Sequence, residues 1–273
     1  MQKIAVTGST GLLGNKLVSL GCVPLECDIT NPNSIKRAVD EVAPDVIIHC
    51  AAATNIDWCE EHPLEAFNVN VRGVSNLLDC FPTGLLVYTS TVHVFDGHSF
   101  HAYGEKHIPN PINVYGMTKY IGEILSRFRT SKTLVVRISK LFDYSTMVET
   151  LDTLKTTKME FSGILRRSYT YLDDFAKALL YVIEHVDSLR GDILHLGSES
   201  VSCEAHFWAQ ACSVFGIPES QVLWRNHELK DIVPRPLQGG FLAFTRKSYN
   251  IPLLDTLSGL QLLREAQNDE KEN

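Results

Sequence analysis

The sequence predicts an α/β protein with a doubly wound parallel sheet and a smaller C-terminal part. Three observations support this fold class. The stretches DVIIHCAAA (45–53) and GLLVYT (84–89) are apolar runs without polar alternation, as expected of strands buried on both faces of a parallel sheet. Amphipathic helical segments such as 31–42 stand between the strands. The opening strand, 3–7, leads directly into a glycine-rich turn and a helix.

Composition narrows the class of protein. The 273 residues, 44% of them hydrophobic, suffice for one large α/β unit or two coupled domains. A net charge of −7 argues against nucleic-acid and anionic-membrane partners. No apolar run reaches the ~20 residues that span a bilayer, and the first strand leaves no room for a leader, so we expect a cytoplasmic protein. The seven cysteines include no C-x-x-C pair, which predicts reduced thiols rather than a disulfide framework.

The glycine turn GSTGLLG predicts an anion-binding site. Where a strand, a tight turn and a helix N-terminus meet, free backbone N–H groups and the helix dipole converge. The glycines allow the backbone to approach a pyrophosphate, so we expect a dinucleotide here; a plain glycine turn is the alternative. The residues expected to contact the dinucleotide are Gly8, Thr10, Gly11, Leu12, Leu13 and Gly14.

The second strand, Val23–Cys27, is unusually short and leads to Asp28. The spacing between Gly8 and Asp28 is that of an acidic residue that holds the adenosine ribose. The sequence Asp-Ile-Thr at 28–30 is also typical of a turn that borders the adenine, so both Asp28 and Ile29 are candidate cofactor contacts. Because this segment is trimmed, the residue that distinguishes NAD from NADP cannot be located.

The strands at 45–53 and 84–89 place further candidates at the sheet edge where ligands bind. The three alanines at 51–53 allow a ligand to lie close to the backbone, and a polar loop is expected at 54–61, before a helix at 64–80. Thr91 stands at the carboxyl end of the next strand, where chemistry is expected in open α/β sheets. The alternative for Thr91 is a helix-capping hydroxyl.

A histidine-containing loop, 94–113, follows. His98, His101 and His107, with His93 just before the loop, suggest a metal site, but no cysteine joins them. We expect an exposed loop and no metal.

The helix predicted from Asn113 to about Phe128 carries Tyr115 and Lys119, four residues apart and therefore on one face. A free tyrosine has a pKa of about 10. A lysine cation one turn away favours the phenolate and should lower this pKa toward the range useful for general acid–base catalysis. An ordinary amphipathic helix with a buried Tyr and a solvated Lys is the alternative.

The alternation of strands and helices becomes less regular in the second half. We expect residues 1–143 to form a dinucleotide-binding domain and 144–273 mainly a substrate-binding part, with about 163–197 returning to the main sheet. Arg235 lies in a loop that could reach back over the cleft, and a disordered charged tail is expected at 268–273. The other predicted elements are a strand at 133–138, a helix at 147–155, a helix to His185 with Asp173 and Asp174 at its start, a strand at 191–197, and a helix at 204–215 ended by Gly216.

Six motifs in this order, TGSTGLLG, HCAAAT, STVHVF, NPINVYGMTKYIGE, YTYLDD and GDILHLGS, make the chain resemble the extended short-chain dehydrogenases/reductases. Within them it is most similar to the dTDP-4-dehydrorhamnose reductase branch, over nearly the whole length. The resemblance implies a Rossmann-type sheet, NADP(H) or NAD(H) as cofactor, and a catalytic triad of Thr91, Tyr115 and Lys119. It implies cofactor contacts by the glycine turn, Asp28, Ile29, Ala51, Ala52, Ala53, Asn70, Thr89, Tyr115 and Lys119.

The implied reaction is hydride transfer from a nicotinamide to the ketone of a nucleotide-linked sugar. Tyr115 would protonate the developing alkoxide, Lys119 would hold the nicotinamide ribose, and the Thr91 hydroxyl would orient the carbonyl oxygen. The substrate contacts implied are Thr91, His93, Lys140 and Arg235. Arg235 or Arg167 could bind the substrate's phosphates in a bidentate manner; surface salt bridges are the alternative for both.

The chain departs from this branch at three positions. Val92 and His93 replace the usual Asp-Tyr pair, and Lys140 replaces an aromatic residue that packs on the sugar. Two other functions therefore stay open. One is an epimerase or dehydratase of the same fold. The other is a cofactor-binding regulatory subunit, since the beta subunit of methionine adenosyltransferase also resembles this branch. A homodimer is compatible with each of these functions.

Overall fold

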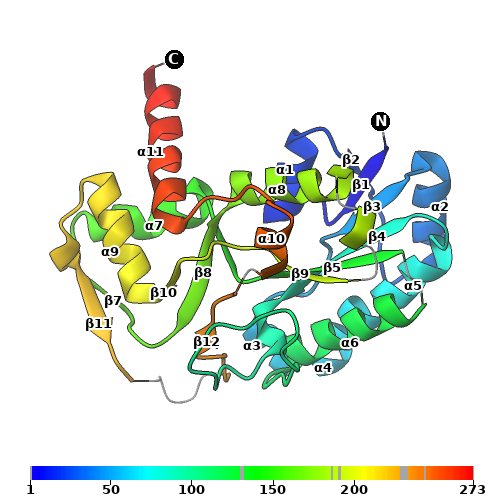
Figure 1. Ribbon diagram of the computed structural model, residues 1–273, viewed down its shortest axis with the longest axis horizontal. Helices are drawn as coiled ribbons and strands as arrows, with labels where there is room; N and C mark the ends of the chain where they lie inside the picture. Colours follow the sequence, from blue (N-terminus) through cyan, green and yellow to red (C-terminus); the bar gives the residue numbers. More distant parts are fainter. Residues whose placement is uncertain are drawn as a thin grey trace.

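A six-stranded parallel sheet lies at the centre of the larger of the two lobes of the molecule (Figure 1). The computed structural model describes residues 2–129, 132–185, 187–189, 192–227, 233–242 and 244–272. In spatial order the strands are β2 (Val23–Pro24), β1 (Ile4–Thr7), β3 (Val46–His49), β4 (Leu85–Thr91), β5 (Thr133–Ile138) and β9 (Ile193–His195). Every neighbouring pair is parallel, which confirms the predicted sheet.

Helices cover both faces of this sheet, so it is doubly wound. On one face α1 (Leu12–Ser19) and α8 (Leu172–His185) bury side chains such as Leu17 and Phe175 against the strands. The opposite face is covered by α2 (Pro32–Val42) and α5 (Gly73–Cys80), with α6 (Val114–Arg129) packed beside α5. All seven cysteines lie in the described part of the chain and are free, as expected. None of the described helices is long and apolar enough to span a bilayer.

The order of the strands fixes where a ligand can bind. Strand β1 has β2 on one side and β3 on the other, so the connections leave β1 in opposite directions. In doubly wound sheets the crevice at such a switch point, outside the carboxyl ends of the strands, is the usual ligand site. The glycine turn follows β1, and the alanines 51–53 follow β3.

The segment after β3 is more helical than predicted. The polar loop expected at 54–61 is wrong, because α3 (Ile56–Glu61) forms there, with the Asn55 side chain accepting a hydrogen bond from Trp58 N. The predicted helix at 64–80 is present as α4 (Pro63–Phe67), a π-helical turn η1 (Asn68–Arg72) and α5. Such π turns often occur at functional sites.

A second sheet organises the smaller lobe. Strand β8 (Arg166–Tyr171) lies at its centre and pairs with β10 (Val201–Cys203), β12 (Gln238–Gly239) and β6 (Lys140–Phe142). Within 163–197, therefore, α8 and β9 belong with the main sheet, whereas β8 does not; Gly191 lies outside the described residues. The remaining elements of the lobe are β7 (Met159–Ser162), β11 (Val222–Arg225), α7 (Tyr144–Leu154), α9 (Glu204–Phe215) and α11 (Thr256–Glu272).

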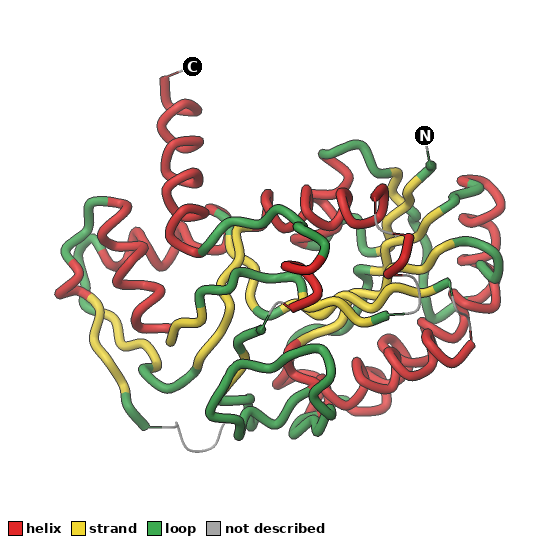
Figure 2. The backbone as a smooth tube through the Cα atoms, viewed as in Figure 1, coloured by secondary structure: helices red, strands yellow, loops and turns green. Residues whose placement is uncertain are grey.

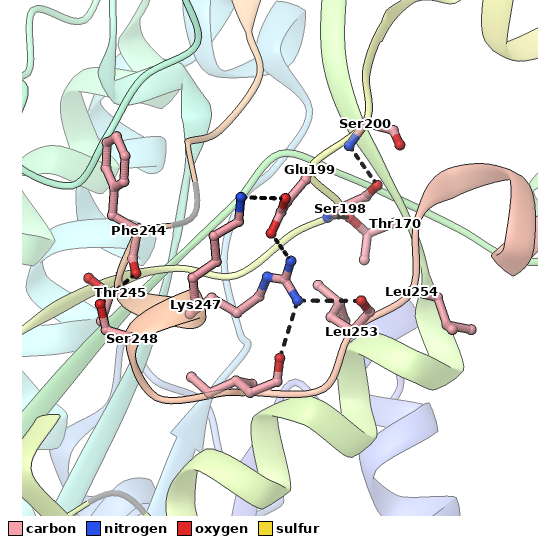
Figure 3. Close-up of polar contacts among 12 residues, drawn as sticks. Thr170, Ser198, Glu199, Ser200, Phe244, Thr245, Lys247, Ser248, Leu253 and Leu254 are labelled. Atoms are coloured by element: carbon pink, nitrogen blue, oxygen red, sulfur yellow. Dashed lines mark hydrogen bonds and ion pairs between the residues drawn. The ribbon is translucent and has the colours of Figure 1, made fainter.

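The C-terminal segment crosses from one lobe to the other. In the short helix α10 (Phe244–Ser248), Arg246 and Lys247 both pair with Glu199 (Figure 3). Arg246 also donates to the backbone carbonyls of Ile251 and Leu253, between α10 and α11. The tail expected to be disordered is helical through residue 272, because α11 begins with Leu260 and Leu263 buried in the core of the smaller lobe. Its later turns project from the body (Figure 1).

A long loop follows η2 (Val92–Val94) and lies beside the second sheet (Figure 2). We expected this loop to be exposed, which is wrong for Phe95 and Tyr103: both are buried and stacked on each other with ring centroids 4.1 Å apart. Backbone hydrogen bonds join the loop to the chain around β12, from Tyr103 N to Gly240 O and from Leu242 N to Tyr103 O. The remaining short helices are η3 (Asp187–Leu189) and η4 (Glu219–Gln221).

Candidate active site

A cleft of about 300 Å³ opens at the carboxyl ends of the main-sheet strands. A larger hollow of about 750 Å³ on the smaller lobe, between α9, α11 and β11, is lined by none of the predicted site residues. The predicted residues that line the cleft are Gly8, Gly11, Leu12, Leu13, Gly14, Ala52, Thr89, Thr91, Tyr115 and Lys119. The lining residues not predicted are Cys50, Thr54, Ser90, Ile138, Ser139 and Leu141. Most of these six stand at strand ends, a position that already singled out Thr91.

The glycine turn has the shape of a pyrophosphate cradle. Gly8 has φ +67°, and a Cβ there would lie 2.7 Å from Ala51 N. A Cβ on Gly14 would lie 2.1 Å from Gly8 O, so α1 packs against the turn only without a side chain. Helix α1 has Gly11 as its N-cap and no side-chain cap, which leaves its first N–H groups available to an anion. The turn therefore fits a dinucleotide.

Tyr115 and Lys119 reach the cleft from one face of α6, as predicted. Burial raises the pKa of Tyr115 to about 12, and a hydrogen bond with the Thr91 side chain acts in the opposite direction. The expectation that Lys119 lowers the pKa of Tyr115 is therefore wrong: burial dominates, and the lowering interaction comes from Thr91.

Burial lowers the pKa of Lys119 to about 8, while Cys50 and Glu123 act to raise it. Its ammonium lies 4.3 Å from the centre of the Tyr88 ring, a cation–π contact that partly replaces water. At neutral pH Lys119 is thus mainly a cation, and its lowered pKa lies close to that pH.

A buried ion pair joins helix α6 to strand β5. Glu123 lies one turn beyond Lys119 and binds Arg137 of β5 through two hydrogen bonds of 2.7 and 2.9 Å. Ser90, which lines the cleft, donates to the same carboxylate. Arg137 in turn contacts His195 of β9. The interpretation from sequence missed this network, although a charged residue inside the apolar run TLVVRI was a visible signal.

Thr91 serves two partners. Its hydroxyl accepts a hydrogen bond from His93 N, which starts η2, and also interacts with Tyr115. The capping and catalytic interpretations are therefore compatible. Thr89 donates to His49 O and ties β4 to β3 at the cleft floor.

His93 packs beside Tyr115, outside the cleft lining. Its ring meets Tyr115 edge to face, and Asn113 Nδ2 lies 3.4 Å from its Nδ1. Burial, followed by the charges of Arg167, Arg235 and Lys140, lowers the pKa of His93 to about 3. Lys140 and Arg235, which we expected to contact the substrate, therefore lie near His93. His93, Lys140 and Arg235 do not line the cleft itself.

The two arginines differ in their surroundings. Arg235 forms an ion pair with Asp57 of α3 at 2.8 Å, so its loop does reach the lobe that contains the main sheet. Arg167 is buried, and its Nη1 donates to the carbonyl of Pro236. Burial lowers the pKa of Arg167, while Tyr169 and Glu204 act in the opposite direction.

The other predicted cofactor residues lie outside the cleft lining. Asp28 accepts hydrogen bonds from Thr30 N and Oγ1, which lower its pKa, so its carboxylate closes a local turn. Asn70 accepts from Ala53 N and donates to Ala53 O, and therefore positions the end of β3. The rest of this group are Thr10, Ile29, Ala51 and Ala53.

Two of the loop histidines contact residues of the same loop. His98 lies 3.8 Å from Asp96, and His107 Nδ1 contacts the backbone of Gly104. Among the residues that the structure describes, no group of three or more His, Cys, Asp or Glu side chains could hold a metal ion.

Comparison with known proteins agrees with this geometry. Residues 1–234 match the family described as RmlD substrate binding domain. A dTDP-4-dehydrorhamnose reductase from Aggregatibacter actinomycetemcomitans is 31% identical over 219 residues, covering 73% of this chain and 74% of that protein. Methionine adenosyltransferase 2 subunit beta from Danio rerio is 28% identical over 249 residues, covering 81% and 76%. A dTDP-4-dehydrorhamnose reductase from Bacillus anthracis, solved with NADP, superposes with a TM-score of 0.88 at 26% identity, covering 96% and 98%.

Proposed function

Because the chain belongs to the RmlD substrate binding domain family, we propose that it is an NAD(P)H-dependent reductase of a nucleotide-linked keto-deoxysugar, similar to dTDP-4-dehydrorhamnose reductase. The observation that carries the proposal is the convergence of Thr91, Tyr115 and Lys119 on the cleft that the glycine turn closes. The reductase relatives of known structure, one of them solved with NADP, support the cofactor class.

The residues of the chain would divide the chemistry between them. A reduced nicotinamide, when bound, supplies the hydride. Tyr115 gives its phenolic proton to the carbonyl oxygen, and at neutral pH it holds this proton because its pKa is raised to about 12. Thr91 orients the same oxygen and the phenol, and the Lys119 cation stabilises the negative charge that develops on the phenol.

The charge near His93 supports an anionic substrate. Arg167, Arg235 and Lys140 all lie close enough to His93 to lower its pKa. A ligand that brings its own negative charge, such as a diphosphate, would meet these three cations. Val92 is fully buried in the cluster of Phe95 and Tyr103, so its replacement of a polar residue alters the wall behind the site.

The test is a reduction assay with a matched inactive variant. The protein is incubated with dTDP-4-dehydrorhamnose and NADPH or NADH, and absorbance of the reduced nicotinamide is followed. We expect oxidation that depends on the sugar and is lost in Tyr115→Phe. If neither cofactor is oxidised above background while calorimetry shows that one of them binds, the substrate assignment is wrong.

A cofactor-binding subunit without turnover is a second candidate. It is favoured by the likeness to methionine adenosyltransferase 2 subunit beta over 81% of this chain. Dinucleotide binding without turnover on any of a panel of nucleotide-linked keto-sugars would support this candidate over the reductase.

A further inference from the structure

The shortened segment after β2 sets the charge at the adenosine end of the dinucleotide site. We propose that Glu26 occupies the position of the ribose-binding acid and that the chain therefore binds NAD(H) more tightly than NADP(H). This inference rests on the proposed cofactor function and adds a choice between the two cofactors.

The strand register places Glu26 beside the glycine turn. Strand β2 pairs in parallel with β1 so that Pro24 lies opposite Val6, and Leu25 N donates to Val6 O at 2.8 Å. Continuing this register by two residues brings Glu26 level with Gly8, the first residue of the turn. An acidic side chain at the end of the second strand is the group that binds the 2′-hydroxyl of the adenosine ribose in dinucleotide folds.

Burial on either side of Glu26 indicates the direction of its side chain. Leu25 is buried, and Cys27 partly buried, in the core cluster beneath α2 and α5. In an extended segment the intervening side chain points to the opposite face. That face is the one covered by α1, whose N-terminus closes the glycine turn, and Glu26 is exposed there.

Asp28, the acid favoured by spacing, is less suited to this role. Its Oδ1 already accepts two hydrogen bonds from Thr30, at 2.9 and 2.7 Å. It nevertheless adds a second negative charge close to Glu26, because the two residues are separated only by Cys27.

The segment that contains Glu26 has no cation of its own. No Lys or Arg occurs between Lys16 and Lys36. Lys16 is paired with Asp173 at 2.6 Å, and Lys36 with Asp40 at 2.8 Å. A 2′-phosphate at the ribose would therefore meet two carboxylates, whereas a 2′-hydroxyl can donate a hydrogen bond to Glu26.

The test compares the two cofactors by binding alone. Dissociation constants for NADH and NADPH are measured by calorimetry on the full chain at low and high salt. We expect NADH to bind at least tenfold more tightly at low salt. The ratio should shrink at high salt, since repulsion between exposed charges is screened.

Two variants locate the effect. Glu26→Gln should weaken NADH binding and strengthen NADPH binding, so that the two constants converge. Glu41→Gln removes the same charge from α2 at the other end of the sheet, where Lys3 Nζ binds Val42 O, and should leave the ratio unchanged.

The outcomes separate this inference from the proposed function. Equal or tighter binding of NADPH, or a Glu26→Gln variant with the parent's ratio, overturns the cofactor preference while the reductase proposal stands. Absence of binding by both cofactors overturns the dinucleotide site and this inference with it.

Discussion

His93 and Tyr115 meet edge to face, with their ring centroids 5.6 Å apart and their planes at 64°. Asn113, the residue just before α6, lies against the imidazole and also donates to Pro234 O. The phenol proposed as proton donor is therefore packed against a neutral ring, and Asn113 links that ring to the loop that carries Arg235.

The pH dependence of activity should lack a histidine titration. The pKa of His93 is lowered to about 3, so its ring stays neutral throughout the range in which the protein is folded and assayed. Between pH 5.5 and 7.5, kcat/KM for the keto-sugar should show no inflection near 6.5, the ordinary value for histidine. An inflection there that disappears in His93→Gln would show that the imidazole carries a proton.

Replacing Tyr115 by phenylalanine removes the proton donor and little else. We expect kcat to fall about a hundred- to ten-thousandfold, the usual contribution of a positioned general acid, with cofactor affinity nearly unchanged. Tyr120→Phe, which removes a hydroxyl from the same helix, is the matched control. Parent-like turnover by Tyr115→Phe would favour the non-catalytic candidate.

Cofactor affinity should fall as pH rises through about 8. Lys119 has its pKa lowered to that value, so its cation is fully present only well below pH 8 and is lost as the pH rises through 8. Calorimetric titrations with NADH between pH 6.5 and 9.5 should show this loss in the parent. Lys119→Met should bind weakly and with no pH dependence in this range; the same slope in that variant would assign the effect to another group.

Two of the three cleft glycines, Gly11 and Gly14, should respond differently to valine. Gly11 has an extended backbone, and a Cβ there meets only Gly8 O at 3.3 Å, so Gly11→Val should lose dinucleotide binding while keeping the fold. Gly14→Val drives a Cβ into the same carbonyl and should also lower the denaturation midpoint. Unchanged affinity in Gly11→Val, measured by calorimetry, would remove the turn from the cofactor site.

Breaking the buried ion pair should be costly. Glu123 and Arg137 are 2% and 1% exposed, so Glu123→Gln leaves an uncompensated guanidinium in the sheet. We expect about 3–5 kcal/mol of lost stability in urea unfolding, whereas a Glu123→Leu, Arg137→Met double variant should lose clearly less. Equal losses would mean that packing, rather than charge, determines the effect.

Local patterns predicted the main sheet and much of the cleft. Apolar runs, the glycine turn and the spacing of Tyr115 and Lys119 depend on neighbours in sequence, and each was found where expected. The α3 helix was missed because a single capping side chain, Asn55, decides it. The place of β8 in a second sheet was missed because β12 and β10 come from distant parts of the chain.

The surroundings of the site residues were harder to foresee than their identity. The raised pKa of Tyr115 and the lowered pKa of His93 both follow chiefly from burial, which spacing along the chain does not report. Similarly, Arg137 could be seen as a charge in a strand, but its partner Glu123 lies on a helix packed against that strand.

The attachment of the loop after η2 to the chain near β12 has a consequence for synthesis on the ribosome. Tyr103 exchanges backbone hydrogen bonds with Gly240 and Leu242, and Gln238 N donates to Gly97 O. More than a hundred residues are translated between these partners. The loop therefore lacks these hydrogen bonds until long after the glycine turn and α6 have emerged. A nascent chain released before residue 242 would carry Thr91, Tyr115 and Lys119 but lack the partner strand that holds this loop. Premature termination thus yields a chain that has the proposed catalytic side chains but lacks the hydrogen-bond partners of the loop between them.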